Sequence, residues 1–128
     1  MFMAQKYQDL RIWQRSMQLV THVYGCSKAF PREEIYGLTN QLRRAAVSVP
    51  LNIAEGAGCD SQKEFKHFLS IARRSLYEVM TALELAAQLQ FVPAHTIQPL
   101  LDESDQIAGM IAGLISRIET HQQAKSIH

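Results

Sequence analysis

The sequence lacks the long apolar segments and the cysteine content that mark membrane proteins and secreted disulfide-rich proteins. No apolar run approaches the roughly 20 residues that cross a bilayer, and the first residues lack the apolar core of a signal peptide. We therefore expect a cytoplasmic protein that makes no contact with a membrane. The two cysteines, Cys26 and Cys59, are 33 residues apart with no Cys-x-x-Cys spacing, so we expect free thiols that act as small packing residues.

Catalytic and cofactor-binding patterns are missing as well. No serine has the Gly-x-Ser-x-Gly context of a hydrolase, and Gly56-Ala-Gly58 follows an expected helix instead of opening one after a strand, as a phosphate loop would. Glu64 and His67 have Glu-x-x-His spacing, but a di-iron bundle needs a second such pair and two more glutamates. We therefore expect no enzyme activity, no cofactor, no metal and no small-molecule substrate.

Helical periodicity is the dominant feature of the sequence. Hydrophobic residues make up 47% of the 128 residues and charged residues 20%, as in an ordinary globular domain. Apolar residues recur three and four apart in four stretches, which predicts four amphipathic helices. The first runs from about Gln8 to Ala29, and the second begins between Glu33 and Thr39 and ends at Gly58. The third runs from Ser61 to about Gln90, and the fourth from Ala94 or Pro99 to Thr120. The short connections favour an all-α, antiparallel up-down-up-down four-helix bundle. It would be one domain over residues 1–128, with a core of about 8–120 and frayed ends.

Local signals predict where these helices begin and end. Ser61-Gln-Lys-Glu64 fits a capping box, in which the serine hydroxyl accepts from the Glu64 N–H. Glycine adopts the left-handed conformation easily, so Gly56 and Gly58 are expected to end the second helix, and Pro93 to stop the third. Pro50 costs about 3 kcal/mol in a straight helix. The apolar phase runs through it unbroken, which predicts one helix kinked at Pro50.

The first helix carries two apolar ridges. One alternates three and four apart and is the predicted bundle seam: Leu10, Trp13, Met17, Val20 and Tyr24. Beside it lies the second: Ile12, Leu19, Val23 and Cys26. Two ridges exceed what one helix of a monomeric bundle buries, which favours an intersubunit face, a larger monomeric core being the alternative. Gly109 and Gly113 likewise predict close packing of another helix on the fourth helix.

The stretch from 41 to 58 has a polar stripe beside an apolar one. On a wheel of about 100° per residue, the polar side chains gather within roughly 80°: Arg44, Ser48, Asn52 and Glu55. One interpretation is a binding site. The other, which we favour, is a buried structural network in which Arg44 pairs with Glu55, because a buried charge is retained only when it is paired.

Charge is distributed unevenly along the chain, although the net charge is only +1. Residues 1–74 hold 11 Lys/Arg and 6 Asp/Glu, while residues 75–128 hold 2 and 6. In an up-down bundle the basic side chains lie toward one end and the middle, away from the acidic start of the fourth helix at Asp102, Glu103 and Asp105. The candidate nucleic-acid-binding residues are Arg11, Arg15, Lys63, Lys66, Arg73 and Arg74. A solvated helix surface explains the same residues.

Three motifs indicate a family. They are Arg44-x-x-x-Ser48-x-Pro50-x-Asn52-Ile53-Ala54-Glu55-Gly56, Phe68-Leu69-x-x-Ala72-x-x-Ser75-x-x-Glu78, and Asp9-Leu10-x-Ile12-Trp13 with Tyr24 downstream. Together they resemble, over roughly residues 7 to 118, the bacterial four-helix-bundle proteins called 23S rRNA intervening-sequence proteins. One departure is Arg74, where the family usually has glycine. The resemblance implies a cytosolic, non-enzymatic bundle that forms homopentamers, and relatives that accompany diversity-generating retroelements are thought to bind nucleic acid.

Two hypotheses of function follow. The first is an oligomeric accessory protein that binds RNA or DNA through its phosphates. The second is an assembly or scaffold module whose partner is another protein, with no nucleic-acid role. Binding to arbitrary RNA that weakens with salt would favour the first, and an exposed apolar patch would favour the second.

Overall fold

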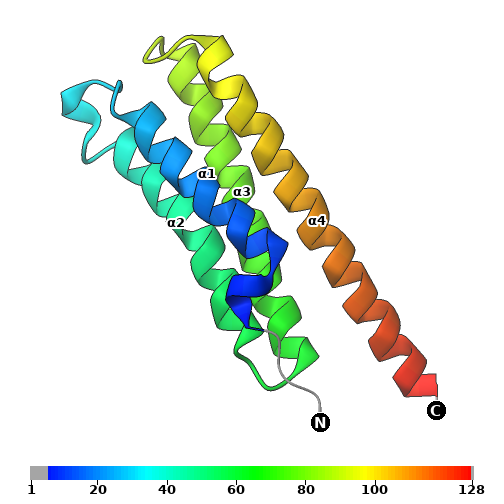
Figure 1. Ribbon diagram of the computed structural model, residues 1–128. Coiled ribbons are helices and arrows are strands. Elements are labelled where there is room, and N and C mark those ends of the chain that lie inside the picture. Colours follow the sequence, from blue (N-terminus) through cyan, green and yellow to red (C-terminus); the bar gives the residue numbers. More distant parts are fainter. Residues whose placement is uncertain (1–5, 128) are drawn as a thin grey trace.

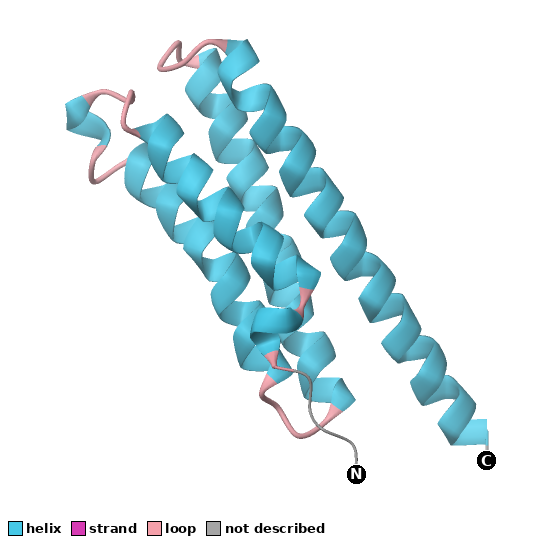
Figure 2. Cartoon of the chain, in the orientation of Figure 1, coloured by secondary structure: helices cyan, strands magenta, loops and turns pink. Residues whose placement is uncertain are grey.

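The computed structural model describes residues 6–127, with side chains described through residue 124. It contains four α-helices, α1 (Arg11–Ser27), α2 (Leu38–Ala57), α3 (Gln62–Gln88) and α4 (Ala94–Ile127), and two short 3₁₀ helices, η1 (Tyr7–Asp9) and η2 (Arg32–Glu34). No strand occurs between residues 6 and 127 (Figure 2). The all-α class and the number of helices are therefore as predicted.

The four long helices lie side by side (Figure 1). The α1–α2 and α3–α4 connections lie at one end of the molecule, and the α2–α3 connection lies at the other. Helix α1 packs against α2 and α4, and α3 packs against the same two helices, so α1 and α3 are diagonal to each other. The core between them is aliphatic, and its largest fully buried side chains include Leu19, Leu42, Ile53, Leu69, Leu76, Leu83, Ile107 and Ile111.

Most helix boundaries agree with the sequence, and the ends show two differences. The Ser61 hydroxyl accepts a hydrogen bond from the Glu64 N–H at 3.1 Å, which confirms the predicted cap of α3. Helix α2 is continuous through Pro50, which is buried within it. Helix α1 begins at Arg11 instead of Gln8, because η1 occupies the preceding residues. Helix α4 continues to Ile127, past its predicted end at Thr120.

The causes of two helix ends differ from those expected. Gly58, the C-terminal cap of α2, has φ −85°, so no left-handed glycine ends that helix. Helix α3 ends before Pro93 is reached. Gln90 adopts φ 64°, and the Phe91 N–H bonds the Ala86 carbonyl at 2.8 Å, which is the hydrogen-bond pattern of a Schellman motif. Backbone hydrogen bonds therefore terminate α3.

The two ridges of α1 exchange the roles that were predicted for them. Leu19 and Val23 are fully buried, whereas Met17 is 44% exposed and Tyr24 is 39% exposed. The predicted seam is therefore a half-exposed surface, and the second ridge faces the core. Ser16 completes the core ridge: it is fully buried, and its hydroxyl donates to the Ile12 carbonyl. Counting apolar residues misses this position, because a serine satisfied by its own helix packs as a small core residue.

Helices α2 and α3 form the most extensive contact in the bundle. A Cβ at Gly56 would lie 2.9 Å from both Phe65 Cδ1 and Phe68 Cβ, and 3.3 Å from the Phe65 carbonyl oxygen. Position 56 therefore needs glycine because α3 lies against it, and not for a turn. This close approach brings the polar stripe of α2 next to α3.

Candidate functional site

Two residues of the predicted polar stripe form a hydrogen-bonded cluster with α3. Asn52 Nδ2 donates to the Ser48 carbonyl oxygen at 2.8 Å and to Ser48 Oγ at 2.9 Å. Ser48 Oγ also shares a hydrogen bond with Ser75 Oγ across the helix contact, at 2.9 Å. Ser75 is 4% exposed, so the cluster satisfies polar groups where the helices meet.

The other two residues of the stripe do not belong to a buried network. Arg44 and Glu55 are both exposed, and no ion pair joins them within the described part of the chain. The predicted pairing is wrong for a geometric reason: eleven residues of α-helix rise by about 16 Å. A shared helix face was mistaken for proximity along the axis.

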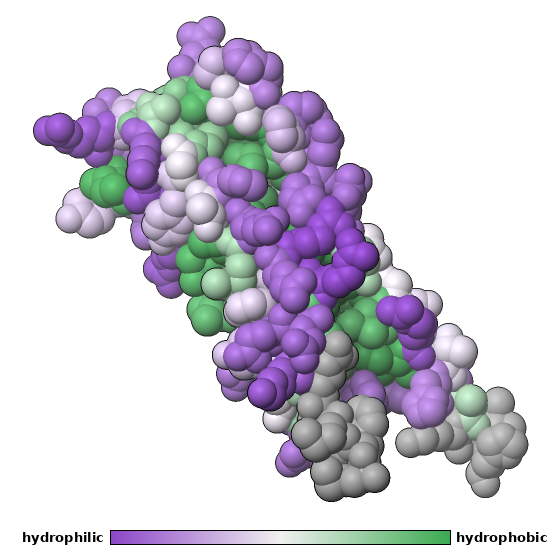
Figure 3. Space-filling model, in the orientation of Figure 1, coloured by the Kyte–Doolittle hydropathy of each residue, from purple (hydrophilic) through white to green (hydrophobic). Residues whose placement is uncertain are grey.

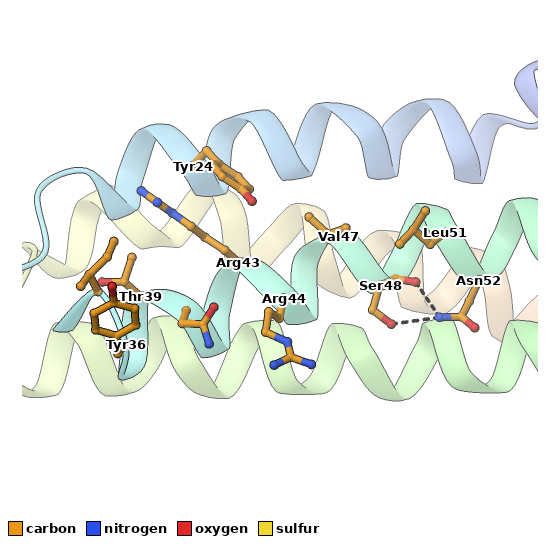
Figure 4. Close-up of a pocket in the computed structure, with 11 residues that line it drawn as sticks. Tyr24, Tyr36, Thr39, Arg43, Arg44, Val47, Ser48, Leu51 and Asn52 are labelled. Atoms are coloured by element: carbon orange, nitrogen blue, oxygen red, sulfur yellow. Dashed lines mark hydrogen bonds between the residues drawn. The ribbon is translucent and has the colours of Figure 1, made fainter.

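Arg44, Ser48 and Asn52 instead line an open hollow of about 680 Å³ on the outer face of α2. Tyr24 of α1 and Tyr36, in the connection before α2, lie on its rim (Figure 4). The other lining residues are Ile35, Thr39, Asn40, Arg43, Val47 and Leu51. Two guanidinium groups line this hollow, and none of the described carboxylates does.

Arg43 is held in place at the α1 side of this hollow. Its guanidinium carbon lies 4.7 Å from the centroid of the Tyr24 ring, within range of a cation–π interaction. Its Nε donates to Ser27 Oγ at 2.8 Å. Arg44, the next residue, extends toward α3 instead (Figure 4). The two arginines thus lie on opposite sides of the hollow.

The predicted separation of basic and acidic residues is wrong at Arg15. Its guanidinium contacts the Glu103 carboxylate, with Nε–Oε2 at 2.9 Å and Nη2–Oε1 at 2.5 Å. Nη2 also donates to Gln106 Oε1 at 2.6 Å. The Arg15 hydrogen bonds hold the pKa of Glu103 below its ordinary value. Glu103 lies nine residues into α4, about 14 Å from its start, and this brings it level with the first turns of α1.

The remaining basic candidates fall into two groups. Lys66 Nζ lies 3.1 Å from Glu119 Oε2, and Arg73 Nε donates to the Tyr77 hydroxyl on the same helix at 3.2 Å. Arg11, Lys63 and Arg74 are exposed, and none forms an ion pair with the residues that the structure describes. Two of the six candidates lie on α1 and four on α3, and these two helices do not contact each other within the described residues.

Two other findings concern metals and membranes. Among residues whose side chains are described, no group of three or more His, Cys, Asp or Glu is arranged to hold a metal ion. None of the described helices is long and apolar enough to span a bilayer. Both cysteines are free thiols, as predicted, and burial raises the pKa of Cys26.

Comparison with known proteins identifies the family. A family model described as 23S rRNA-intervening sequence protein matches residues 8–113. The chain belongs to this family. Its fold is also similar to the crystal structure of a protein of unknown function from the S23 ribosomal protein family of Bacteroides thetaiotaomicron, with a TM-score of 0.73 at 19% identity over 81% of this chain and 97% of that one. A comparison with curated proteins gives no match.

The structure explains several residues of the intervening-sequence motif. Gly56 allows the α2–α3 contact, and Ser48, Asn52 and Ser75 form the cluster beside it. Arg74, which departs from the expected glycine, is exposed, so it does not enter that contact.

Sequence reasoning about this family member missed Arg43, Tyr36 and Arg117. Arg43 directly precedes Arg44, but it points toward α1, so the stripe on one helix face did not include it. Tyr36 lies in an irregular connection, where periodicity carries no information. Arg117 lines a second hollow together with Arg11, and only the packing of α4 against α1 places those two residues together.

Proposed function

We propose that this intervening-sequence family member is a non-enzymatic, cytoplasmic accessory protein that binds RNA or DNA through phosphate contacts. The observation that carries the proposal is a set of exposed cations with no carboxylate partner among the described residues: Arg11, Arg44, Lys63 and Arg74. Such cations neutralise phosphates and release counterions. The family description, which names 23S rRNA, supports a nucleic-acid partner. Arg15 and Lys66 contribute less, because each already faces a carboxylate.

We also propose how the four helices are arranged and that α2 bends at Pro50. An up-down-up-down antiparallel bundle distributes the four cations over α1, α2 and α3. A bend at Pro50 would follow from the missing hydrogen bond to the Ala46 carbonyl. The support for this bend is the position of Pro50 in the interior of α2, where its ring and its missing N–H disturb the preceding turn.

The first prediction tests phosphate binding. Replacing Arg11, Lys63 and Arg74 with glutamine should weaken binding to an unstructured single-stranded RNA and lower its salt slope by about 2, at roughly 0.7 per phosphate contact. Anisotropy titrations at about 50 and about 200 mM salt measure both effects. Lys66→Gln is the matched control. It removes one charge that Glu119 already neutralises, so the slope should change little. Wild-type protein that does not bind RNA at about 50 mM salt would remove the proposal.

Exposed apolar surface favours a second candidate, a homo-oligomeric scaffold. Met17 of α1 and Leu51 of α2 are exposed, Leu51 by 63%, and hydrophobic surface appears over α2 and along the lower part of α4 (Figure 3). A Cβ at Gly109 or Gly113 would meet nothing within 4 Å, so no helix of the described residues covers that part of α4. A further copy of the chain, in a pentamer by family resemblance, would cover such surfaces.

The second prediction concerns this assembly. Purified protein at micromolar concentration should give, by light scattering, several times the chain mass of 14.5 kDa. A Met17→Glu, Leu51→Glu variant should shift to lower mass because charge is costly at a buried interface. A wild-type protein that is a monodisperse monomer would contradict the scaffold candidate.

A further inference from the structure

The hollow on α2 contains an aromatic ring, Tyr36, as well as the cations that phosphate contacts require. We infer that it binds a single-stranded segment of nucleic acid, with backbone phosphates at Arg43 and at Arg44 and one base stacked on Tyr36. This inference rests on the proposed function, and it names both the site and the form of nucleic acid.

Arg43 is ordered before any ligand arrives. Its guanidinium group lies over the Tyr24 ring, and Ser27 Oγ accepts from Nε. Ser27 itself is 2% exposed and donates to the Tyr24 carbonyl. The two Nη groups of Arg43 have no protein acceptor among the described residues. A guanidinium fixed in this way loses little side-chain freedom on binding, and it presents two donors to a phosphate.

The charge around the hollow suits an anion. Arg44 is exposed and directed toward α3 (Figure 4), and no ion pair to it occurs in the part of the chain described. Of the nearby carboxylates, Glu34 accepts from the Leu38 N–H at 2.9 Å, where it caps the start of α2. Glu78 lines, together with Arg44 and Ser48, an adjoining smaller hollow toward α3. Among the described residues, the hollow on α2 is therefore lined by two cations and by no carboxylate.

The exposed ring of Tyr36 favours single-stranded over double-stranded nucleic acid as the ligand. Its side chain is 93% exposed, and no other aromatic ring stacks on it within the described chain. A base can lie on such a ring only when it is unpaired and turned out of its stack, as in single strands and loops. A duplex would meet the arginines but not the tyrosine.

The test compares two labelled RNAs of equal length, an unstructured single strand and a blunt duplex, at about 50 mM salt. Tyr36→Ala should weaken single-strand binding about tenfold and leave its salt slope unchanged, because stacking is lost and no charge is removed. Tyr36→Phe, the matched control, should bind within about twofold of wild type because the ring remains. Arg44→Gln should lower the single-strand slope by about 0.7. Duplex binding should not respond to either Tyr36 variant.

Each contrary result has a distinct meaning. Single-strand binding by Tyr36→Ala equal to wild type overturns the inference, but leaves phosphate binding elsewhere intact. A lower oligomer mass for Tyr36→Ala than for Tyr36→Phe, measured by light scattering, shows that a second copy of the chain covers this face, and also overturns it. Failure of the wild type to bind either RNA removes the proposed function itself.

Discussion

Replacing Gly56 with leucine should lower the free energy of unfolding by about 3 kcal/mol. Leucine is the better helix former by about 0.8 kcal/mol, so the loss must come from packing. A Cβ at this position is 2.9 Å from Phe65 Cδ1 and Phe68 Cβ. The second contact cannot be relieved by a rotamer change, because Phe68 Cβ is fixed to the backbone of α3. Urea unfolding followed by circular dichroism measures the difference.

Gly113 provides the matched control for Gly56. It also lies inside a helix, but a Cβ there meets nothing within 4 Å. Gly113→Ala should therefore raise the unfolding free energy by up to about 1 kcal/mol through helix propensity alone. A Gly56→Leu variant as stable as the wild type would show that α2 and α3 are farther apart at this point. A destabilised Gly113→Ala would show that another copy of the chain packs on α4.

Leu19→Ala should cost about 2–5 kcal/mol, while Met17→Ala should cost under about 1 kcal/mol. The two positions lie two residues apart on α1, but Leu19 is fully buried and Met17 is 44% exposed. Truncating Leu19 removes transfer free energy and leaves a cavity in the core. Chemical denaturation at low protein concentration, where association contributes least, gives both values.

The comparison tests which ridge of α1 faces the core. Equal losses at both positions would mean that Met17 is also buried, in which case the exposed ridge is an interface between copies. A larger loss at Met17 than at Leu19 would contradict the orientation of α1 in the structure.

Periodicity predicted the fold because it reports which residues share a helix face. The 3-4 spacing of α3 runs through Leu69, Leu76 and Leu83, all fully buried, and the Ser61 cap marks where that helix begins. These signals are local: each depends on residues within a few turns of one helix. The family motif from Arg44 to Gly56 is likewise a continuous run in α2.

Contacts between helices could not be predicted in the same way. Arg15 and Glu103 are 88 residues apart in the sequence, and their pairing depends on the relative axial positions of α1 and α4. The choice between the two ridges of α1 depended on Ser16, whose polarity concealed its burial. The hollow with Arg43 and Tyr36 combines a helix with an irregular connection, and no repeat in the sequence relates them.

The unequal helix lengths make stability uneven along the molecule. Helix α4 has 34 residues and α1 has 17, or about 51 Å against about 25 Å at the α-helical rise. A full four-helix cross-section exists only along α1. Near the C-terminal end of α4, Lys66 at the start of α3 is paired with Glu119. Backbone amides of α4 after Glu119 should therefore exchange with solvent through local fraying, whereas those around Val79 and Leu83 should exchange only when the whole bundle opens. We expect the last turns of α4 to unfold and refold while the core stays intact.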